Sequence, residues 1–503
     1  MNGDGILEVA IVGAGFTGLG AGIQLQRAGI SNFRIFEKAA ALGGVWRDNS
    51  YPGLCCDIPS HLYSYSFAPN PNWSRRFAPG SEILEYQQRC HEQFGMGAFI
   101  HYGMEVTAAT YDAKAALWIL DFLNGEQVRV KYLISMSRGL SQPLYAKIDG
   151  VESFTGVTMH TACWDANYDF RGKHVAVIGN GASGIQAIPQ LAKVAASVTV
   201  FQRTPSWVLP RKDHAYSTFG KALFRWVPGV QRLHRLQLFL LQELIYPALK
   251  KPGGLIHRAL TRMAVAHINQ SIADPVLRKK LTPNFQLGCK RVLVSDDYYP
   301  SFSLQHVSLQ TSAIVKVSED QVICADGSQH RADVLVYSTG FRNIGEMPFA
   351  ITGQNGKTLA QVWGDAPAAY LGVVTAGFPN LFTVLGPNSA FGHQSALFVI
   401  ERHVDYIVRC IRHANRKGWR SMDVKSDVQN AYNELMQKRF HGMVWTGNCP
   451  VWFKNQSGRI VTNTPDSGFA FWRRVRRPDF RDFIVETIGD GSHQSTPAAS
   501  TTC

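Results

Sequence analysis

The chain has 503 residues, 45% of them hydrophobic and 17% charged, and its formal net charge is +14. This length predicts more than one domain with a sizeable core, and the composition is that of ordinary globular proteins. The basic residues are dispersed and no nucleic-acid motif lies among them. We therefore interpret the charge as general surface charge and attraction for an anionic cofactor, not as a nucleic-acid site. The N-terminal residues have no basic region followed by an apolar stretch, and no run of 18 apolar residues occurs, so we expect no signal peptide and no membrane-spanning helix.

The cysteines argue against two further classes of protein. Nine cysteines are scattered through the chain without a C-x-x-C pair or a zinc-site spacing. We therefore expect free thiols, a cytoplasmic location and no metal. Cys55 and Cys56 are adjacent rather than separated, which argues against the dithiol chemistry of disulfide reductases.

A first glycine-rich motif follows a predicted strand near the N-terminus. Residues 7–12 predict a buried parallel strand and residues 19–28 a helix. In the G-x-G-x-x-G between them, the glycines permit a tight turn, approach of a pyrophosphate and packing of the helix on the strand. The next strand ends at Glu37, where a ribose-binding carboxylate is expected. The motif predicts a dinucleotide at the helix N-terminus, bound by Gly13, Gly15, Phe16, Thr17 and Gly18.

A second strand–glycine–helix unit begins at residue 173. Its predicted strand (173–178) and helix (185–192) enclose another G-x-G-x-x-G. The following strand (197–201) is succeeded by Arg203 and Thr204 instead of a carboxylate. Because a cation suits a 2′-phosphate, we expect NADPH rather than NADH here, with a plain surface arginine as the alternative. The expected binding residues are Gly179, Asn180, Gly181, Ala182, Ser183, Gly184, Ile185, Gln186, Arg203 and Thr204.

The segment between the two units carries a longer pattern, F-x-G-x-x-x-H-x-x-x-W-D. Its fixed residues are Phe154, Gly156, His160, Trp164 and Asp165. This pattern resembles the fingerprint of type I Baeyer–Villiger monooxygenases, a family of class B flavoprotein monooxygenases. The resemblance implies that the segment joins an FAD domain to an NADP domain and that its histidine and tryptophan couple their motion. A tryptophan followed by aspartate also favours ketone oxidation, because relatives that oxygenate amines and sulfides usually carry Tyr or Phe there.

Further segments fit the same resemblance, which spans about residues 6–480. A Gly-Gly-x-Trp and a Tyr-Pro-Gly segment resemble the parts of these flavoproteins that line FAD, so FAD is the expected first nucleotide. By resemblance, the residues near it are Val45, Trp46, Asp57, Tyr63 and Val106. The segments 333–341 and 379–388 resemble the later FAD-binding segments, to which we assign them. Arg138 is a departure, since family members often have glycine there.

Lys290 and Arg291 resemble the cationic segment that reaches the flavin in this family. A guanidinium stays charged at any working pH and can stabilise the anionic peroxide that reduced FAD forms with O2 at C4a, which makes Arg291 the expected catalytic residue. Asp57 would hold it through a charged hydrogen bond, and Lys290 would be a second contact to the 2′-phosphate. The alternative is a pair of exposed charges before a strand.

The resemblance implies an NADPH- and O2-dependent monooxygenase that converts a ketone to an ester or lactone through a C4a-peroxyflavin. The flavin would supply the chemistry, and the protein would supply position and electrostatic field. Two alternatives stay open: an N- or S-oxygenating flavin-containing monooxygenase, and a flavin reductase or flavin-binding protein that transfers no oxygen.

Between about residues 215 and 280 the chain is helical, basic and apolar. Leu233, Leu236, Leu240 and Leu244 recur at helical spacing. We favour a packed helical cap inserted in the NADP domain over a helix that lies on a membrane surface, although peripheral membrane contact stays open.

The expected fold is α/β, with two Rossmann-like dinucleotide-binding domains. The first part of the FAD domain spans residues 1–150, and the NADP domain with its helical cap spans 151–330. The second part of the FAD domain spans 331–488 and includes a substrate-lining region, with the loop that begins at 443–447. A tail at 489–503, rich in Ser, Thr, Pro and Gly, is expected to be disordered.

Overall fold

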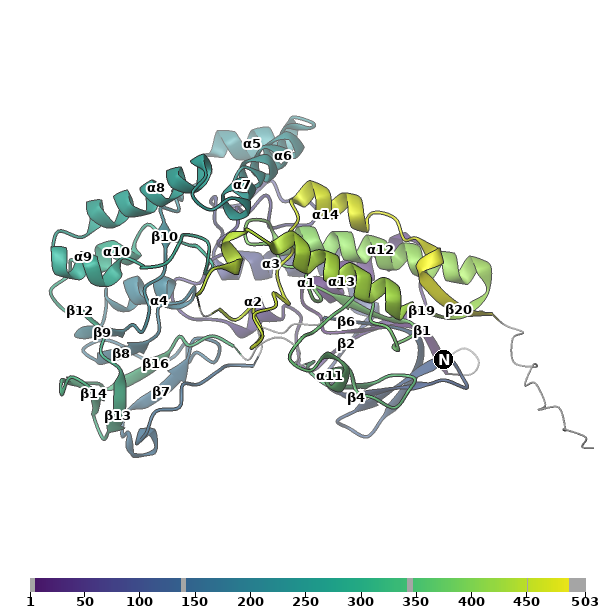
Figure 1. The fold of residues 1–503 in the computed structure, drawn as a ribbon, viewed down its shortest axis with the longest axis horizontal. Coiled ribbons are helices and arrows are strands. Elements are labelled where there is room, and N and C mark those ends of the chain that lie inside the picture. Colours follow the sequence, from purple (N-terminus) through teal and green to yellow (C-terminus); the bar gives the residue numbers. More distant parts are fainter. Residues whose placement is uncertain (1–4, 137–141, 342–346, 450, 488–503) are drawn as a thin grey trace, which may run out of the picture.

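The computed structural model describes residues 5–136, 142–341, 347–449 and 451–487. Arg138 and the tail 489–503 lie outside these ranges. Two lobes, each built on a β-sheet, lie side by side, and a group of helices rises above their junction (Figure 1). No helix of the described ranges is both long and apolar enough to cross a membrane.

The larger sheet forms the right-hand lobe in Figure 1. Its strands are β1 (Ile6–Val12), β2 (Phe33–Glu37), β3 (Ile100–Tyr102), β4 (Val106–Asp112), β5 (Leu117–Phe122), β6 (Gln127–Met136), β17 (Ala350–Thr352) and β18 (Leu381–Val384). They follow the order β17-β4-β5-β6-β1-β2-β3, with β18 beside β6. The central strand β1 runs parallel to β2 and β6 and is buried at Val9, Ala10 and Ile11, which explains its apolar run.

Two long helices cover this sheet. They are α1 (Phe16–Arg27) and α12 (Ala396–Lys417), which pack against each other. The side chain of Ser395 caps α12 by accepting a hydrogen bond from the amide of Leu397, and Gly418 ends it in the left-handed conformation. The remaining helices of this lobe are α2 (Val45–Asp48), α3 (Gly80–Gln93), α11 (Leu359–Trp363), α13 (Ser426–Phe440) and α14 (Gly468–Val475). From β17 onward the chain adds β18 and α12 to this lobe.

The second sheet forms the left-hand lobe in Figure 1 and is entirely parallel. Its strands are β7 (Val157–His160), β8 (His174–Ile178), β9 (Ser197–Phe201), β12 (Val307–Gln310) and β16 (Val334–Tyr337). The order is β12-β9-β8-β16-β7, with α4 (Gly184–Leu191) following β8. Each glycine-rich motif thus stands between a central parallel strand and a helix, as predicted.

One strand assignment made from the sequence is wrong. We assigned segment 333–341 to the second part of the first domain, but β16 pairs with β8 and β7 in the second sheet. The chain next joins the larger sheet at β17, so the boundary expected at residue 331 lies too early. The apolar strand fits either sheet by composition, and only the pairing decides between them.

The inserted helical region is present, but its packed face differs from the expectation. Its helices are α5 (Thr218–Trp226), α6 (Val230–Glu243), α7 (Tyr246–Lys250), α8 (Leu255–Ser271) and α9 (Pro275–Leu281). The leucine stripe of α6 is exposed to solvent, whereas Leu238 is buried and Arg235 and Glu243 contact the body of the protein. Charged contacts and the buried Leu238, not the leucine stripe, fix the orientation of this helix.

Three small sheets and one short helix complete the fold. The first sheet pairs β10 (Val208–Leu209) with β11 (Leu293–Val294), and the second contains β13 (Ile314–Ser318), β14 (Gln321–Cys324) and β15 (Gln329–Arg331). The third sheet pairs β19 (Trp419–Val424) with β20 (Phe483–Thr487). The short helix is α10 (Tyr298–Ser301). The β10–β11 pair matters for the site because it brings the segments after residues 209 and 294 together.

Candidate active site

The first glycine motif forms a narrow turn at the N-terminus of α1. A Cβ atom on Gly18 would lie 1.8 Å from the carbonyl oxygen of Gly13, so only glycine lets the helix sit this close to the strand. A Cβ on Gly15 would face the backbone of Gly44 at 3.7 Å. No side chain of the described residues caps α1 at Gly15, which leaves first-turn amides to bind an anion. The cradle fits a diphosphate.

Glu37 is buried beside this turn. Its carboxylate accepts hydrogen bonds from the amides of Ala14 at 2.7 Å and Ala39 at 3.0 Å, and it pairs with Arg47 at 3.1 Å. A carboxylate offers about four lone-pair positions, so these three contacts leave it able to accept one more bond from a hydroxyl. Glu37 therefore fits the predicted ribose contact.

Aromatic side chains predicted near the flavin gather beside the start of α1. The indole of Trp46 donates to the hydroxyl of Tyr63 at 3.1 Å, and the Tyr63 ring meets the edge of Phe16 with centroids 5.5 Å apart. Burial raises the pKa of Tyr63, so its hydroxyl stays protonated and can donate. Val106 is buried in the same apolar cluster as Phe36, the residue before Glu37.

The second glycine motif has the same architecture at α4. A Cβ on Gly184 would lie 2.8 Å from the carbonyl oxygen of Gly179, and a Cβ on Gly179 would lie 2.6 Å from that of Ser338. Ser338 directly follows β16, so the segment that we assigned to the first domain helps build the second site. No described side chain caps α4 at Ser183, and Asn180 is held by a 2.7 Å hydrogen bond to Gln202.

Arg203 and Lys290 bring two cations together near this motif. Burial lowers the pKa of Lys290, and the charge of Arg203 lowers it further. No carboxylate of the described residues lies within ion-pair distance of either side chain, and the Lys290 ammonium lies 5.1 Å from the ring of Phe285. Two neighbouring cations without an anionic partner fit a phosphate group. Thr204 lies beside them, partly exposed.

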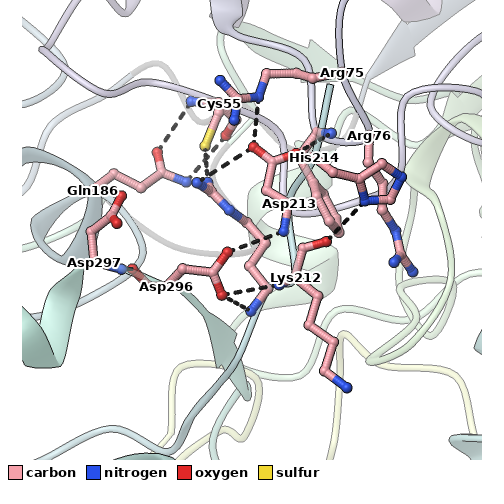
Figure 2. A network of polar contacts seen from close by, with 12 residues as sticks. Cys55, Arg75, Arg76, Gln186, Lys212, Asp213, His214, Asp296 and Asp297 are labelled. Carbon is pink, nitrogen blue, oxygen red and sulfur yellow. Dashed lines mark hydrogen bonds and ion pairs between the residues drawn. The ribbon is translucent and has the colours of Figure 1, made fainter. Parts of the chain in front are cut away.

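Gln186 on α4 connects the two lobes. Its amide oxygen accepts from the hydroxyl of Tyr51 at 2.9 Å, and its amide nitrogen donates to the carbonyl of Cys55 at 3.1 Å. Figure 2 shows Gln186 and Cys55 beside the acidic residues Asp213 and Asp296. The loop that carries Asp57 is thereby fixed against the start of the second nucleotide helix.

Two aspartates extend this connection. Asp213 pairs with Arg75 of the first lobe at 2.7 Å, and Asp296 accepts hydrogen bonds from the amides of Arg211, Lys212 and Asp213 at 2.8, 3.0 and 3.1 Å (Figure 2). The sequence analysis missed this network, since isolated charges in loops carry no local signal of their partners. The network holds the chain that follows Arg291 against the first lobe.

Arg291 meets Asp57 at this junction, as the family resemblance implies. The guanidinium donates to the Asp57 carboxylate, whose charge raises the pKa of Arg291. The side chain of Arg291 is 51% exposed, so one face of a permanent cation stays accessible beside Tyr63 and Cys56. This is a fixed positive charge between two nucleotide sites.

The segment 154–165 occupies the edge of the second lobe. Gly156 packs so closely that a Cβ would lie 2.3 Å from the carbonyl of Asp333 and 2.6 Å from the Phe154 ring. His160 ends β7, is fully buried and accepts from the amide of Ala162 at 3.0 Å. Trp164 stacks on Phe170, and its carbonyl accepts from the hydroxyl of Ser50 at 3.4 Å, while Asp165 is exposed. The segment thus contacts the loop before Tyr51, which belongs to the first lobe.

The expectation that all cysteines are free thiols is wrong for one pair. Cys289 and Cys449 form a disulfide with Cα atoms 6.3 Å apart, whereas six other cysteines of the described ranges are free. The two residues are separated by 160 positions, and Gly288, the residue before Cys289, lies close to Val444. The bond lies directly before Lys290 and Arg291. The spacing of the cysteines in the sequence could not predict this pairing.

Two glycine-rich dinucleotide sites with a fixed cation at their junction define an oxidoreductase with two nucleotide cofactors. The sequence profile of the flavin-binding monooxygenase-like family matches residues 7–351. A Baeyer–Villiger monooxygenase of Pseudomonas aeruginosa is 38% identical over 484 residues, which are 95% of this chain and 92% of that protein. A steroid monooxygenase bound to NADP has a TM-score of 0.85 at 25% identity, covering 96% of this chain and 100% of that one. Cyclohexanone monooxygenase from Rhodococcus sp. Phi1 bound to NADP+ has a TM-score of 0.85 at 26% identity, covering 96% of this chain and 99% of that one.

The chain belongs to the flavin-binding monooxygenase-like family, and within it to the monooxygenases of the Baeyer–Villiger type. The family membership inferred from the F-x-G-x-x-x-H-x-x-x-W-D pattern is therefore confirmed.

Proposed function

We propose that this enzyme uses FAD, NADPH and O2 to convert an organic ketone to an ester or lactone. The observation that carries the proposal is the Arg291–Asp57 pair at the junction of two nucleotide cradles. When bound, the nicotinamide and the flavin supply the reducing equivalents and the activated oxygen atom for this insertion.

The residues of each cradle have separate tasks. The α1 N-terminus and Glu37 would hold the diphosphate and ribose of FAD, and Trp46 and Tyr63 would contact its flavin portion. The α4 N-terminus holds the diphosphate of NADPH, while Arg203 and Lys290 bind its 2′-phosphate. The residues fit both groups because first-turn amides are free of side-chain caps in both helices and the two cations have no carboxylate partner in the described ranges.

Arg291 contributes to catalysis by stabilising negative charge that develops during the reaction. Asp57 orients its guanidinium and raises its pKa, so the cation is in place before negative charge develops on the reacting oxygen atoms. A pre-oriented cation stabilises such charge without reorganisation, which is worth roughly 10²- to 10³-fold in rate for a single donor. We include the cytoplasmic location in this proposal: six cysteines of the described ranges are free thiols, whereas the Cys289–Cys449 disulfide counts against a reducing compartment.

The test compares products of the wild-type enzyme and Arg291→Ala. Purified enzyme with FAD, NADPH and a panel of cyclic, linear and aryl ketones and thioethers is examined by mass spectrometry for esters, lactones and sulfoxides. We expect ester or lactone in the wild type and at least a 100-fold slower formation in Arg291→Ala, with NADPH still consumed. Arg171→Ala is the matched control, because Arg171 also pairs with an aspartate but is 80% exposed. Sulfoxide alone, or hydrogen peroxide alone with every substrate, would refute the proposal.

A further inference from the structure

Large apolar side chains are exposed along α5 and α6 and at the residue that ends α6. We call this set the apolar ridge: Phe219, Trp226, Leu233, Leu236, Leu240 and Leu244. Their exposed fractions lie between 44% for Leu240 and 75% for Trp226. Figure 1 shows both helices at the outer edge of the molecule, above the junction of the lobes. Scattered exposed apolar residues are ordinary, but five on two packed helices and a sixth at the end of α6 indicate an interaction surface.

The orientation of α6 is set by polar anchors on its inner face. Arg235 donates to the carbonyls of His61 at 2.6 Å and Ser64 at 2.9 Å and lies 3.8 Å from Glu401. At the other end, Glu243 accepts from Gln394 at 2.8 Å and from the amide of Gly468 at 3.0 Å. Turning the leucines inward would break both anchors. The ridge therefore faces outward as part of the native fold.

The charge around the ridge is of one sign. Residues 217–273 contain eight Lys and Arg residues and a single acid, Glu243, which is bound on the inner face. Arg232, Lys250, Lys251, Arg258 and Arg262 are exposed. Leucine and aromatic side chains on one face of a helix, flanked by cations without carboxylates, are the chemistry that binds anionic bilayers.

We propose that the apolar ridge docks this enzyme on the surface of an anionic lipid bilayer. The ridge side chains enter the boundary between headgroups and acyl chains, and the neighbouring cations bind the phosphate headgroups. Trp226 lies at this boundary, where indole rings are enriched in membrane proteins. Because α6 also contacts His393 and Gln394 of the first lobe, the docked surface is continuous with the body that holds the cofactors.

The test measures binding of the FAD-loaded enzyme to vesicles without turnover, so it is independent of the proposed reaction. Flotation is compared with vesicles of phosphatidylcholine alone and with 30% phosphatidylglycerol, at low and high salt. We expect binding to the anionic vesicles that is weakened at least ten-fold by Leu236→Asp with Leu240→Asp. The triple change Arg232→Gln, Lys250→Gln, Lys251→Gln should also weaken binding and reduce its salt dependence.

Leu123→Asp is the matched control, because Leu123 is 71% exposed in the turn between β5 and β6, on the larger sheet.

Brominated lipids should quench the fluorescence of the wild type more than that of Trp226→Phe, which tests the docked geometry without disturbing the leucines. Three results would overturn the proposal: no binding to anionic vesicles at low salt, equal loss in the Leu123 control, or a wild-type dimer in sedimentation equilibrium that the leucine changes convert to monomer.

Discussion

The two glycine-rich units share one architecture but differ in the charge that follows their second strand. In the first unit, the buried carboxylate of Glu37 is held by two amides and by Arg47. In the second unit, Arg203 and Lys290 are accessible cations with no carboxylate partner in the described ranges. Under the proposed function, both backbone turns would bind a dinucleotide. The charge would decide which ribose is accepted, with a free hydroxyl at the first site and a 2′-phosphate at the second.

The largest difference should appear when each motif's third glycine becomes alanine. Gly18→Ala forces a Cβ to within 1.8 Å of the Gly13 carbonyl, whereas the corresponding distance for Gly184→Ala is 2.8 Å. We expect Gly18→Ala to destabilise the protein by more than about 3 kcal/mol or to prevent folding, and Gly184→Ala to cost roughly 1–3 kcal/mol. Thermal unfolding and flavin content measure both. Equal shifts in the two variants would show that the first turn can relax.

Removing the two cations should change coenzyme preference. Hydrogen bonds to charged groups contribute about 1.5–3 kcal/mol, so Arg203→Ala with Lys290→Ala should raise KM for NADPH about 10- to 100-fold. KM for NADH should stay within a factor of two, because that coenzyme has no 2′-phosphate. Steady-state kinetics with both coenzymes provide the measurement. A parallel rise for NADH would assign the cations to another part of the nucleotide.

Acid should destabilise the first lobe through His403. Burial lowers the pKa of this fully buried imidazole to about 3. Because the folded-state pKa lies below the unfolded value of about 6.5, its contribution to stability is complete above pH 6.5 and is lost as the pH falls toward 3. Between pH 7.5 and 5.0 this loss is about 2 kcal/mol.

His403→Asn should remove that pH dependence while keeping an acceptor for the amide of Leu385. Denaturant unfolding at the two pH values measures the effect, with His441→Asn as an exposed control. The His403 variant should be less stable at pH 7.5 yet lose about 2 kcal/mol less on acidification. An unchanged pH dependence would refute the assignment.

The smallest effect is expected at Glu37. Glu37→Gln keeps an oxygen acceptor for the turn but loses the ion pair with Arg47, so FAD should bind about ten-fold more weakly, equivalent to about 1.4 kcal/mol. Titration of the apoenzyme with FAD measures the change, and Glu105→Gln, an exposed carboxylate on the loop before β4, is the control. Retention of full affinity would mean that the ribose does not use Glu37.

Much of the candidate site could be predicted from the sequence because many of its residues belong to short local motifs. Each glycine motif follows its strand directly, Glu37 ends the next strand of its unit, and Arg203 lies two residues after the next strand of the other, so their positions depend on short-range geometry alone. The Asp57–Arg291 contact spans 234 residues and was reached only through resemblance to a family. Gln186 was expected as a nucleotide residue, but its bonds to Tyr51 and Cys55 could not be foreseen, because loop–loop contacts leave no periodic pattern.

By itself, the sequence determined the two nucleotide units, their charge difference and the family. The tertiary structure decided which sheet β16 joins, which cysteines pair and which face of α6 is covered. Hydrophobic periodicity reports that one face of an element is apolar, but it cannot say what lies against that face. For α6, the answer came from Arg235 and Glu243, whose partners lie far away in the sequence and leave the leucines in solvent.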